Sequence, residues 1–227
     1  MAKKTQETTP ETGLENLNDS LTATVQKVQD NKKIITICSL AVIAVIAIIL
    51  VYIYAFRTPG IQKANDTIGA ADLQLALGND SVAMAQYMDL ADNGSYEAAN
   101  RAALQSAILL YKDGKYEEAL KYADKYSDKD EIIGAGAKSL KGDCLVNLDR
   151  LDEAVKAFNE AVSVSNNNPA YTPFFLMKLA RVYAAQGNHE KEAEAYGKIV
   201  EDYPLYGQSH NIDVQKLLDR ANLQAGK

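Results

Sequence analysis

Side chains that could perform acid–base, nucleophilic or metal chemistry are few and scattered in this sequence. His189 and His210 are the only histidines among the 227 residues, and Cys38 and Cys144 are the only cysteines. Neither the H-E-x-x-H spacing nor the paired C-x-x-C motifs of metal sites occur, and no phosphate-binding G-x-x-x-x-G-K-[ST] loop or G-x-S-x-G nucleophile motif is present. We therefore expect no catalytic residue, no metal and no cofactor, and the chain is predicted not to be an enzyme.

The remaining polar candidates have plainer interpretations. His189 takes a turn position that a packed aromatic residue fills elsewhere, so we expect it to pack, and His210 is expected to be a solvated loop residue. The acidic runs are interpreted as solvated helix faces. The chemistry left to the chain is therefore reversible binding.

A recurring turn marks the elements that would position a binding site. Gly78, Gly114, Asp149 and Gly187 each end one helical pattern and open another, at intervals of 36, 35 and 38 residues. A fixed period in this range is typical of stacked helix–turn–helix units, which bury a continuous core between neighbours. The sequence therefore predicts an all-α solenoid of about four repeats.

Small and bulky residues occupy fixed positions within each unit, counted from the start of its first helix. Position 8 holds Gly142 in the third unit and position 24 holds Phe158, a pairing of small and bulky residues that recurs along the chain. Small residues let two helix axes approach closely, and bulky ones fill the seam between them. Glu192 departs from the pattern, because a small residue is expected at its position 20, so the last helix of the fourth unit is predicted to shift its register.

These positions divide residues 57–227 into repeats. Pro204 is expected to end the fourth unit, because proline cannot continue a helix. The repeats are predicted near residues 64–95, 100–131, 135–168 and 173–205, with a capping helix near residues 211–224.

An uncharged apolar stretch precedes the repeats at residues 34–56. Its 23 residues would form a helix about 34 Å long, enough to cross a hydrocarbon core and longer than the apolar region of a signal peptide. The sequence therefore predicts a single transmembrane helix. Five residues are expected at its membrane interfaces: Lys32, Lys33, Tyr52, Tyr54 and Arg57.

The orientation is predicted from the flanking positive charges. Three lysines precede the span and two cations follow it, which favours a cytoplasmic N-terminus and an extracytoplasmic repeat domain. The tail, residues 1–33, is polar at first and then carries apolar residues with helical spacing over residues 14–29. This short amphipathic helix is interpreted either as a membrane-proximal helix without a separate role or as a docking and self-association helix.

Charge limits the class of partner. The chain carries a net charge of −6, which does not suit binding to nucleic acid. The concave face of the repeats, formed by positions 2, 5, 9 and 12 of each first helix, is instead expected to bind an extended or helical peptide. Its candidate residues are Ile68, Asp72, Arg101, Leu104, Ile108, Tyr111, Asp143, Phe174, Met177 and Arg181. The alternative is that most of them pack on the neighbouring repeat.

The sequence resembles the bacterial membrane-anchored tetratricopeptide repeat proteins, on these landmark residues and on the stretch TPFFLMKLARVYAAQGNHEKEAEAYGKIVEDYP. Its order of tail, span and repeats is similar to that of the ancillary subunit of the Sec translocon, which projects repeats into the periplasm. This resemblance implies an inner-membrane protein with a periplasmic repeat domain. The partners that it implies are the SecYEG channel, a membrane-anchored periplasmic chaperone and emerging exported chains.

Two functions follow as hypotheses. The first is a non-enzymatic scaffold or co-chaperone that is anchored in the membrane and binds proteins or peptides. The second is a structural subunit that associates with itself into a homo-oligomer through its repeats and tail helix. A variant of the first hypothesis reverses the orientation and gives a receptor that faces the cytosol.

Overall fold

The computed structural model describes residues 21–227 except 23–24, 27, 30 and 128–129, and this described part contains helices and no strand. The all-α prediction is confirmed. The chain divides into two units, Met1–Pro59 and Gly60–Lys227. The predicted polar segment of residues 1–13 lies outside the described residues, and the predicted amphipathic helix of residues 14–29 lies largely outside them.

The first unit contains the apolar helix α2, Lys32–Tyr52, and the π-helical turn η1, Ile53–Arg57. No side chain of α2 is buried within the chain, and the rings of Tyr52 and Phe56 stack with their centroids 6.4 Å apart. Among the described residues, this is the one helical stretch that is long and apolar enough to cross a membrane. The uncharged residues 34–56 all lie within these two elements.

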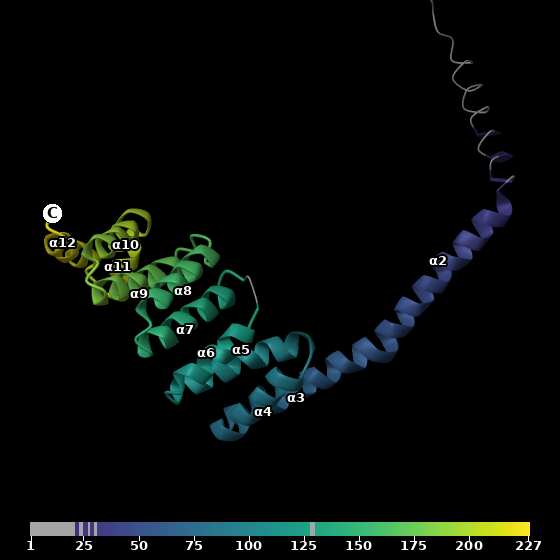
Figure 1. The fold of residues 1–227 in the computed structure, drawn as a ribbon, viewed down its shortest axis with the longest axis horizontal. Coiled ribbons are helices and arrows are strands. Elements are labelled where there is room, and N and C mark those ends of the chain that lie inside the picture. The colour runs from purple at the N-terminus through teal and green to yellow at the C-terminus, as the bar shows by residue number, and fades with distance from the viewer. Residues whose placement is uncertain (1–20, 23–24, 27, 30, 128–129) are drawn as a thin grey trace, which may run out of the picture. The chain divides into compact units, whose positions relative to one another are not determined.

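The second unit contains four helical pairs, α3 to α10, followed by two closing helices. Figure 1 shows them stacked side by side, coloured from teal to yellow. Successive helices from α4 to α10 contact one another, and α12 packs on α10. The first helices of the pairs are α3 Thr58–Ala76, α5 Tyr96–Lys112, α7 Ile133–Asn147 and α9 Thr172–Ala185. The second helices are α4 Asp80–Asn93, α6 Tyr116–Lys125, α8 Leu151–Val164 and α10 His189–Asp202. The chain closes with α11 Pro204–His210 and α12 Val214–Gln224.

The four recurring turn residues all adopt left-handed backbone conformations. The φ angles are +79° at Gly78, +76° at Gly114, +58° at Asp149 and +71° at Gly187. In the second turn, the amide of Gly114 donates to the carbonyl of Tyr111, and the next amide donates to a carbonyl five residues back. This Schellman pattern recurs at the other three turns and satisfies the last carbonyls of each first helix. Asp149 fits because aspartate tolerates this conformation better than most residues do.

We expect Gly114→Ala to lower the free energy of unfolding by about 1 kcal/mol, because an L side chain is strained at this φ. A Cβ atom at Gly114 would meet no other atom within 4 Å, so the loss reports backbone conformation alone. Asp149→Gly is the matched control and should raise the stability by roughly a few tenths of a kcal/mol, because glycine adopts this φ without a steric penalty. Urea unfolding followed by circular dichroism measures both variants, and equal stability of Gly114→Ala and the unchanged protein would contradict the prediction.

The small residues predicted at the helix crossings lie in the core. A Cβ atom built on Gly142 would come within 2.7 Å of the ring of Phe158, so α7 and α8 are in direct contact there. The residue at position 20 is fully buried in all four units. It is alanine in the first three, at Ala83, Ala119 and Ala154, and Glu192 in the fourth. The predicted register shift of α10 is therefore wrong.

Two ion-pairing partners flank Glu192 at a position where alanine is expected, and among the described residues its Oε1 accepts no hydrogen bond. One carboxylate oxygen lies 2.8 Å from His189 Nδ1, and the other lies 3.5 Å from a guanidinium nitrogen of Arg220 on α12. Because a buried carboxylate needs such partners, Glu192 links the last repeat to its capping helix.

The end of the fourth repeat also differs from the prediction. Pro204 does follow the end of α10, but it opens the short helix α11, where its fixed φ suits the first turn. Asn211 then ends α11 with a φ of +54°, so the capping helix begins at Val214 and not at residue 211. The carboxylate of Asp213 accepts a hydrogen bond from the amide of Lys216 and caps α12.

Tyr122 connects the first two repeats through a hydrogen bond. The hydroxyl of Tyr122 on α6 donates to Asp92 Oδ2 on α4 over 2.9 Å, and Lys125 pairs with the other oxygen of this carboxylate. Burial, followed by the hydrogen bond to Asp92, raises the pKa of Tyr122 to about 12. The hydrogen bond from Lys125 lowers the pKa of Asp92.

Stability is therefore expected to fall at alkaline pH. A tyrosine whose pKa is higher in the folded than in the unfolded chain stabilises the fold below about pH 10, the unfolded value, and this contribution is lost as the pH rises through about 12. Tyr122→Phe should cost about 0.5–1.5 kcal/mol at pH 8 and flatten the decline between pH 10 and 12. Urea unfolding at several pH values measures this, with Tyr171→Phe at an exposed tyrosine as control. A slope unchanged by Tyr122→Phe would contradict the assignment.

Candidate functional site

A hollow of about 370 Å³ lies between the first helices of the second, third and fourth repeats. Its walls are mainly apolar, with Leu104 and Ile108 from α5, Ile133 from α7 and Phe174 from α9. Ile133 and Phe174 are 54% and 42% exposed, so large apolar side chains remain accessible at the rim. Hollows of this size and composition are typical of binding sites.

A second hollow of about 190 Å³ lies between the third and fourth repeats. It is lined by Val146 of α7, Phe158 of α8 and Arg181 of α9, among others. Asp143 and Lys178 line both hollows, so the two adjoin at this pair. We call the two hollows together the groove.

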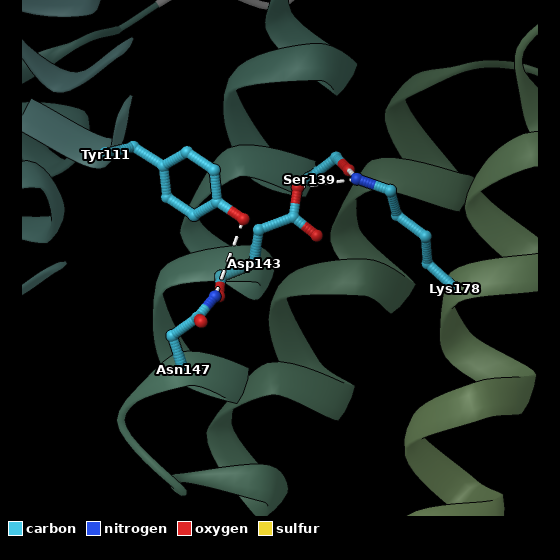
Figure 2. Close-up of polar contacts among 5 residues, drawn as sticks. All are labelled: Tyr111, Ser139, Asp143, Asn147 and Lys178. Carbon is cyan, nitrogen blue, oxygen red and sulfur yellow. Dashed lines mark hydrogen bonds and ion pairs between the residues drawn. The ribbon is translucent and has the colours of Figure 1, made fainter. Parts of the chain in front are cut away.

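Asp143 and Lys178, which line both hollows, form an ion pair. Figure 2 shows these two side chains together with Ser139. Lys178 Nζ lies 2.5 Å from Asp143 Oδ2 and donates to Ser139 Oγ over 3.1 Å. The ammonium also lies 4.8 Å from the centroid of the Phe174 ring, a favourable cation–π distance. The side chains of Lys178 and Asp143 are only 22% and 25% exposed, and burial raises the pKa of Asp143 although Lys178 opposes the shift.

Tyr111 and Asn147 extend this polar arrangement toward α5. Asn147 Nδ2 donates to the carbonyl of Asp143 over 2.8 Å and lies 3.4 Å from the hydroxyl of Tyr111. Burial first, and the charge of Asp143 second, raise the pKa of Tyr111. The phenol therefore stays neutral near pH 7 and can exchange hydrogen bonds with a ligand.

Five of the ten predicted groove residues line the two hollows: Leu104, Ile108, Asp143, Phe174 and Arg181. Tyr111 lies beside them, within 3.4 Å of Asn147. The assignment of Ile68 and Met177 to the groove is wrong, because their side chains are only 2% and 4% exposed and belong to the core. Position 5 of the first helix, which they occupy, faces the adjacent helix in the first and last repeats.

Asp72 and Arg101 do not line the groove. Arg101 pairs with Asp72 across the first two repeats, and the hydroxyl of Tyr87 donates to the same carboxylate over 2.6 Å. Both residues therefore help to hold α3, α4 and α5 together, and their assignment to a ligand site stays a prediction.

Sequence reasoning missed two important groove residues, Lys178 and Ile133. A usable signal existed for Lys178, because it follows Asp143 by 35 residues, which is one repeat period. A search for opposite charges one period apart would have found this pair. Ile133 gave no such signal, because its exposure depends on how the connector before α7 ends.

The predicted interface residues lie at the two ends of the apolar segment of the first unit. Lys32 and Lys33 begin α2 and Tyr52 ends it, while Tyr54 and Arg57 lie in η1. Tyr54 is 72% exposed within the chain.

The histidines lie outside the groove. His189 pairs with Glu192, and His210 is not a loop residue but ends α11, where its ring stacks on Tyr206 with centroids 4.2 Å apart. Among the residues that the structure describes, no cluster of three or more His, Cys, Asp or Glu side chains could hold a metal ion.

Comparison with protein families decides what kind of repeat this is. The tetratricopeptide repeat-like domain matches residues 62–184, more than half of the chain, and a tetratricopeptide repeat matches residues 175–206. The chain belongs to the tetratricopeptide repeat-like family. Its repeats make it a protein-binding scaffold, and proteins of this family are typically scaffolds without catalytic activity.

Solved structures show the same fold at low sequence identity. A crystal structure of MamA protein is similar to the tetratricopeptide chain with a TM-score of 0.57 and 18% identity, over 72% of this chain and 82% of that one. A putative kinesin light chain from Podosopora anserina with nearly identical TPR-like repeats gives a TM-score of 0.56 and 14% identity, over 72% and 87%. No curated protein matches the sequence significantly.

Proposed function

We propose that this tetratricopeptide protein is a non-enzymatic scaffold, anchored in a membrane by α2, whose groove binds a segment of a partner protein. The groove carries the proposal, because it combines accessible apolar side chains with a few placed polar groups. Such a surface binds an extended or helical segment through side-chain pockets.

The membrane anchor rests on the apolar segment of the first unit. Residues 34–56 carry no charge, and no side chain of α2 is buried within the chain. An uncovered apolar helix of this length is stable in a hydrocarbon core, which its roughly 34 Å would span.

The proposed orientation places the N-terminus in the cytoplasm and the repeats in the periplasm of a bacterial cell. The adjacent Lys32 and Lys33 at the start of α2 support it through the preference of cations for the cytoplasmic side. The layout is similar to that of the ancillary translocon subunit, so the SecYEG channel, a periplasmic chaperone and exported chains are the proposed partners.

The groove is tested by crosslinking in cells, purification in mild detergent and mass spectrometry of the full chain and two variants. Phe174→Glu places a charge at the groove and should remove the partners. Leu223→Glu makes the same kind of change at a side chain of α12 that is 76% exposed, and it should keep them. If the same partners are recovered with the Phe174→Glu variant, the groove is not the site that binds them. Recovery of the chain alone would instead favour a self-associating structural subunit.

The orientation is tested with an engineered cysteine at Lys198, an exposed residue of α10. In cells with a permeabilised outer membrane, a membrane-impermeant maleimide should label Lys198→Cys. Labelling that requires rupture of the inner membrane would place the repeats in the cytosol and overturn the periplasmic assignment.

A further inference from the structure

The charges that line the groove do not balance. Asp143 and Lys178 neutralise each other at 2.5 Å, whereas Arg181, which lines the second hollow with them, makes no ion pair among the described residues. The Arg181 side chain is exposed and thus accessible to a ligand. The groove therefore offers one net positive charge on a chain whose total charge is −6.

The apolar end of the groove lies on the same helix as this charge. Phe174 and Arg181 are seven residues apart on α9, which is close to two helical turns, so both project from one face. Seven residues correspond to a rise of about 10 Å along the helix axis. The exposed Phe174 ring and the Arg181 guanidinium thus mark two recognition points at a fixed separation.

The ion pair of Asp143 and Lys178, which lies between these two points, already has its charge and hydrogen-bond partners. Lys178 has Asp143 and Ser139 as partners and the Phe174 ring beside it, so displacing Asp143 would leave a largely buried carboxylate without its cation. Leaving a buried charge without its partner costs free energy. A carboxylate from a ligand is therefore expected to meet Arg181 and not Lys178.

We propose that the groove selects protein segments in which an apolar side chain and an Asp or Glu side chain lie about 10 Å apart. In an extended segment this separation is about three residues, and in a helical segment it is about seven. The apolar side chain enters the larger hollow beside Phe174, and the carboxylate pairs with Arg181. This inference rests on the proposed function, since it names the class of segment that the same groove accepts.

The test uses the full chain in detergent micelles and labelled synthetic peptides of about 12 residues, a length that covers the groove when extended. Each peptide carries one Phe and one Glu in a Gly-Ser background, in both orders and at separations from one to eight residues. Both ends are blocked, so the glutamate supplies the only carboxylate and a terminal carboxylate cannot substitute for it. Fluorescence anisotropy gives the dissociation constants.

We expect binding about three- to ten-fold tighter at a separation of three than at a separation of one, the range for a partly exposed charged pair. Arg181→Glu should abolish this preference, and a peptide with Lys in place of Glu should restore it on the variant. Lys198→Glu on α10 is the control with the same charge change and should leave the preference intact.

The possible failures are distinguishable. Equal binding at every separation, or a preference that Arg181→Glu leaves unchanged, overturns the inference about the acidic side chain. If Phe174→Glu still abolishes peptide binding in that case, the groove remains the site and the proposed function stands. If no peptide binds and Phe174→Glu also retains the cellular partners, the inference and the groove function both fail.

Discussion

Phe158→Ala is expected to lower the free energy of unfolding by about 3–5 kcal/mol, the usual cost of removing a fully buried aromatic side chain. The ring is 1% exposed and fills the seam against Gly142, where the two helices approach too closely for a Cβ atom. Its loss leaves a cavity that α7 and α8 cannot close without moving. Because Phe158 also lines the second hollow, the variant should lose ligand binding as well.

Chemical unfolding in urea and thermal unfolding measure this loss. Phe174→Ala is the matched control, since it removes the same side chain from a residue that is 42% exposed, and its cost should stay below about 1 kcal/mol. Equal stability losses for the two variants would show that Phe158 does not hold the third repeat together.

The second large effect concerns the proposed anchor. Replacing Ile43 and Ile46 by arginine should release the chain from membranes, because each arginine near the centre of a spanning helix costs about 3 kcal/mol. Both isoleucines lie in α2, and both are exposed within the chain, so the change disturbs no internal packing of the described residues.

Extraction of membranes with alkaline carbonate measures the release. The arginine variant should appear in the soluble fraction, whereas a variant with leucine at both positions should stay in the pellet. An arginine variant that remains in the pellet would mean that something other than α2 in the bilayer retains the protein.

The repeat architecture could be predicted because its signals are local in the sequence. The repeat period is visible because each unit has, at its turn, a residue that tolerates a left-handed backbone: Gly78, Gly114, Asp149 and Gly187. This backbone requirement does not depend on distant contacts. The buried alanines at position 20 follow from the close helix crossings in the same way. These features determine a solenoid whatever its ligand.

The groove was predictable only in part, because its details depend on contacts between repeats. Ile68 and Met177 were assigned to the surface by their position in the repeat, yet each packs into a core cluster. The Asp143–Lys178 pair forms across two repeats, and Glu192 is accommodated by Arg220 from the capping helix. Single-helix patterns do not contain this information, since the partners come from other helices.

The burial of Cys144 has a consequence for redox chemistry. The thiol has no exposed surface, and burial raises its pKa to about 11, so only about one molecule in ten thousand carries the reactive thiolate at pH 7. The other cysteine, Cys38, lies in α2 among apolar residues, where an impermeant reagent cannot follow if the helix is in a bilayer. In the folded repeat domain Cys144 is therefore expected to resist disulfide exchange, and a surface cysteine introduced for labelling should react far faster than Cys144.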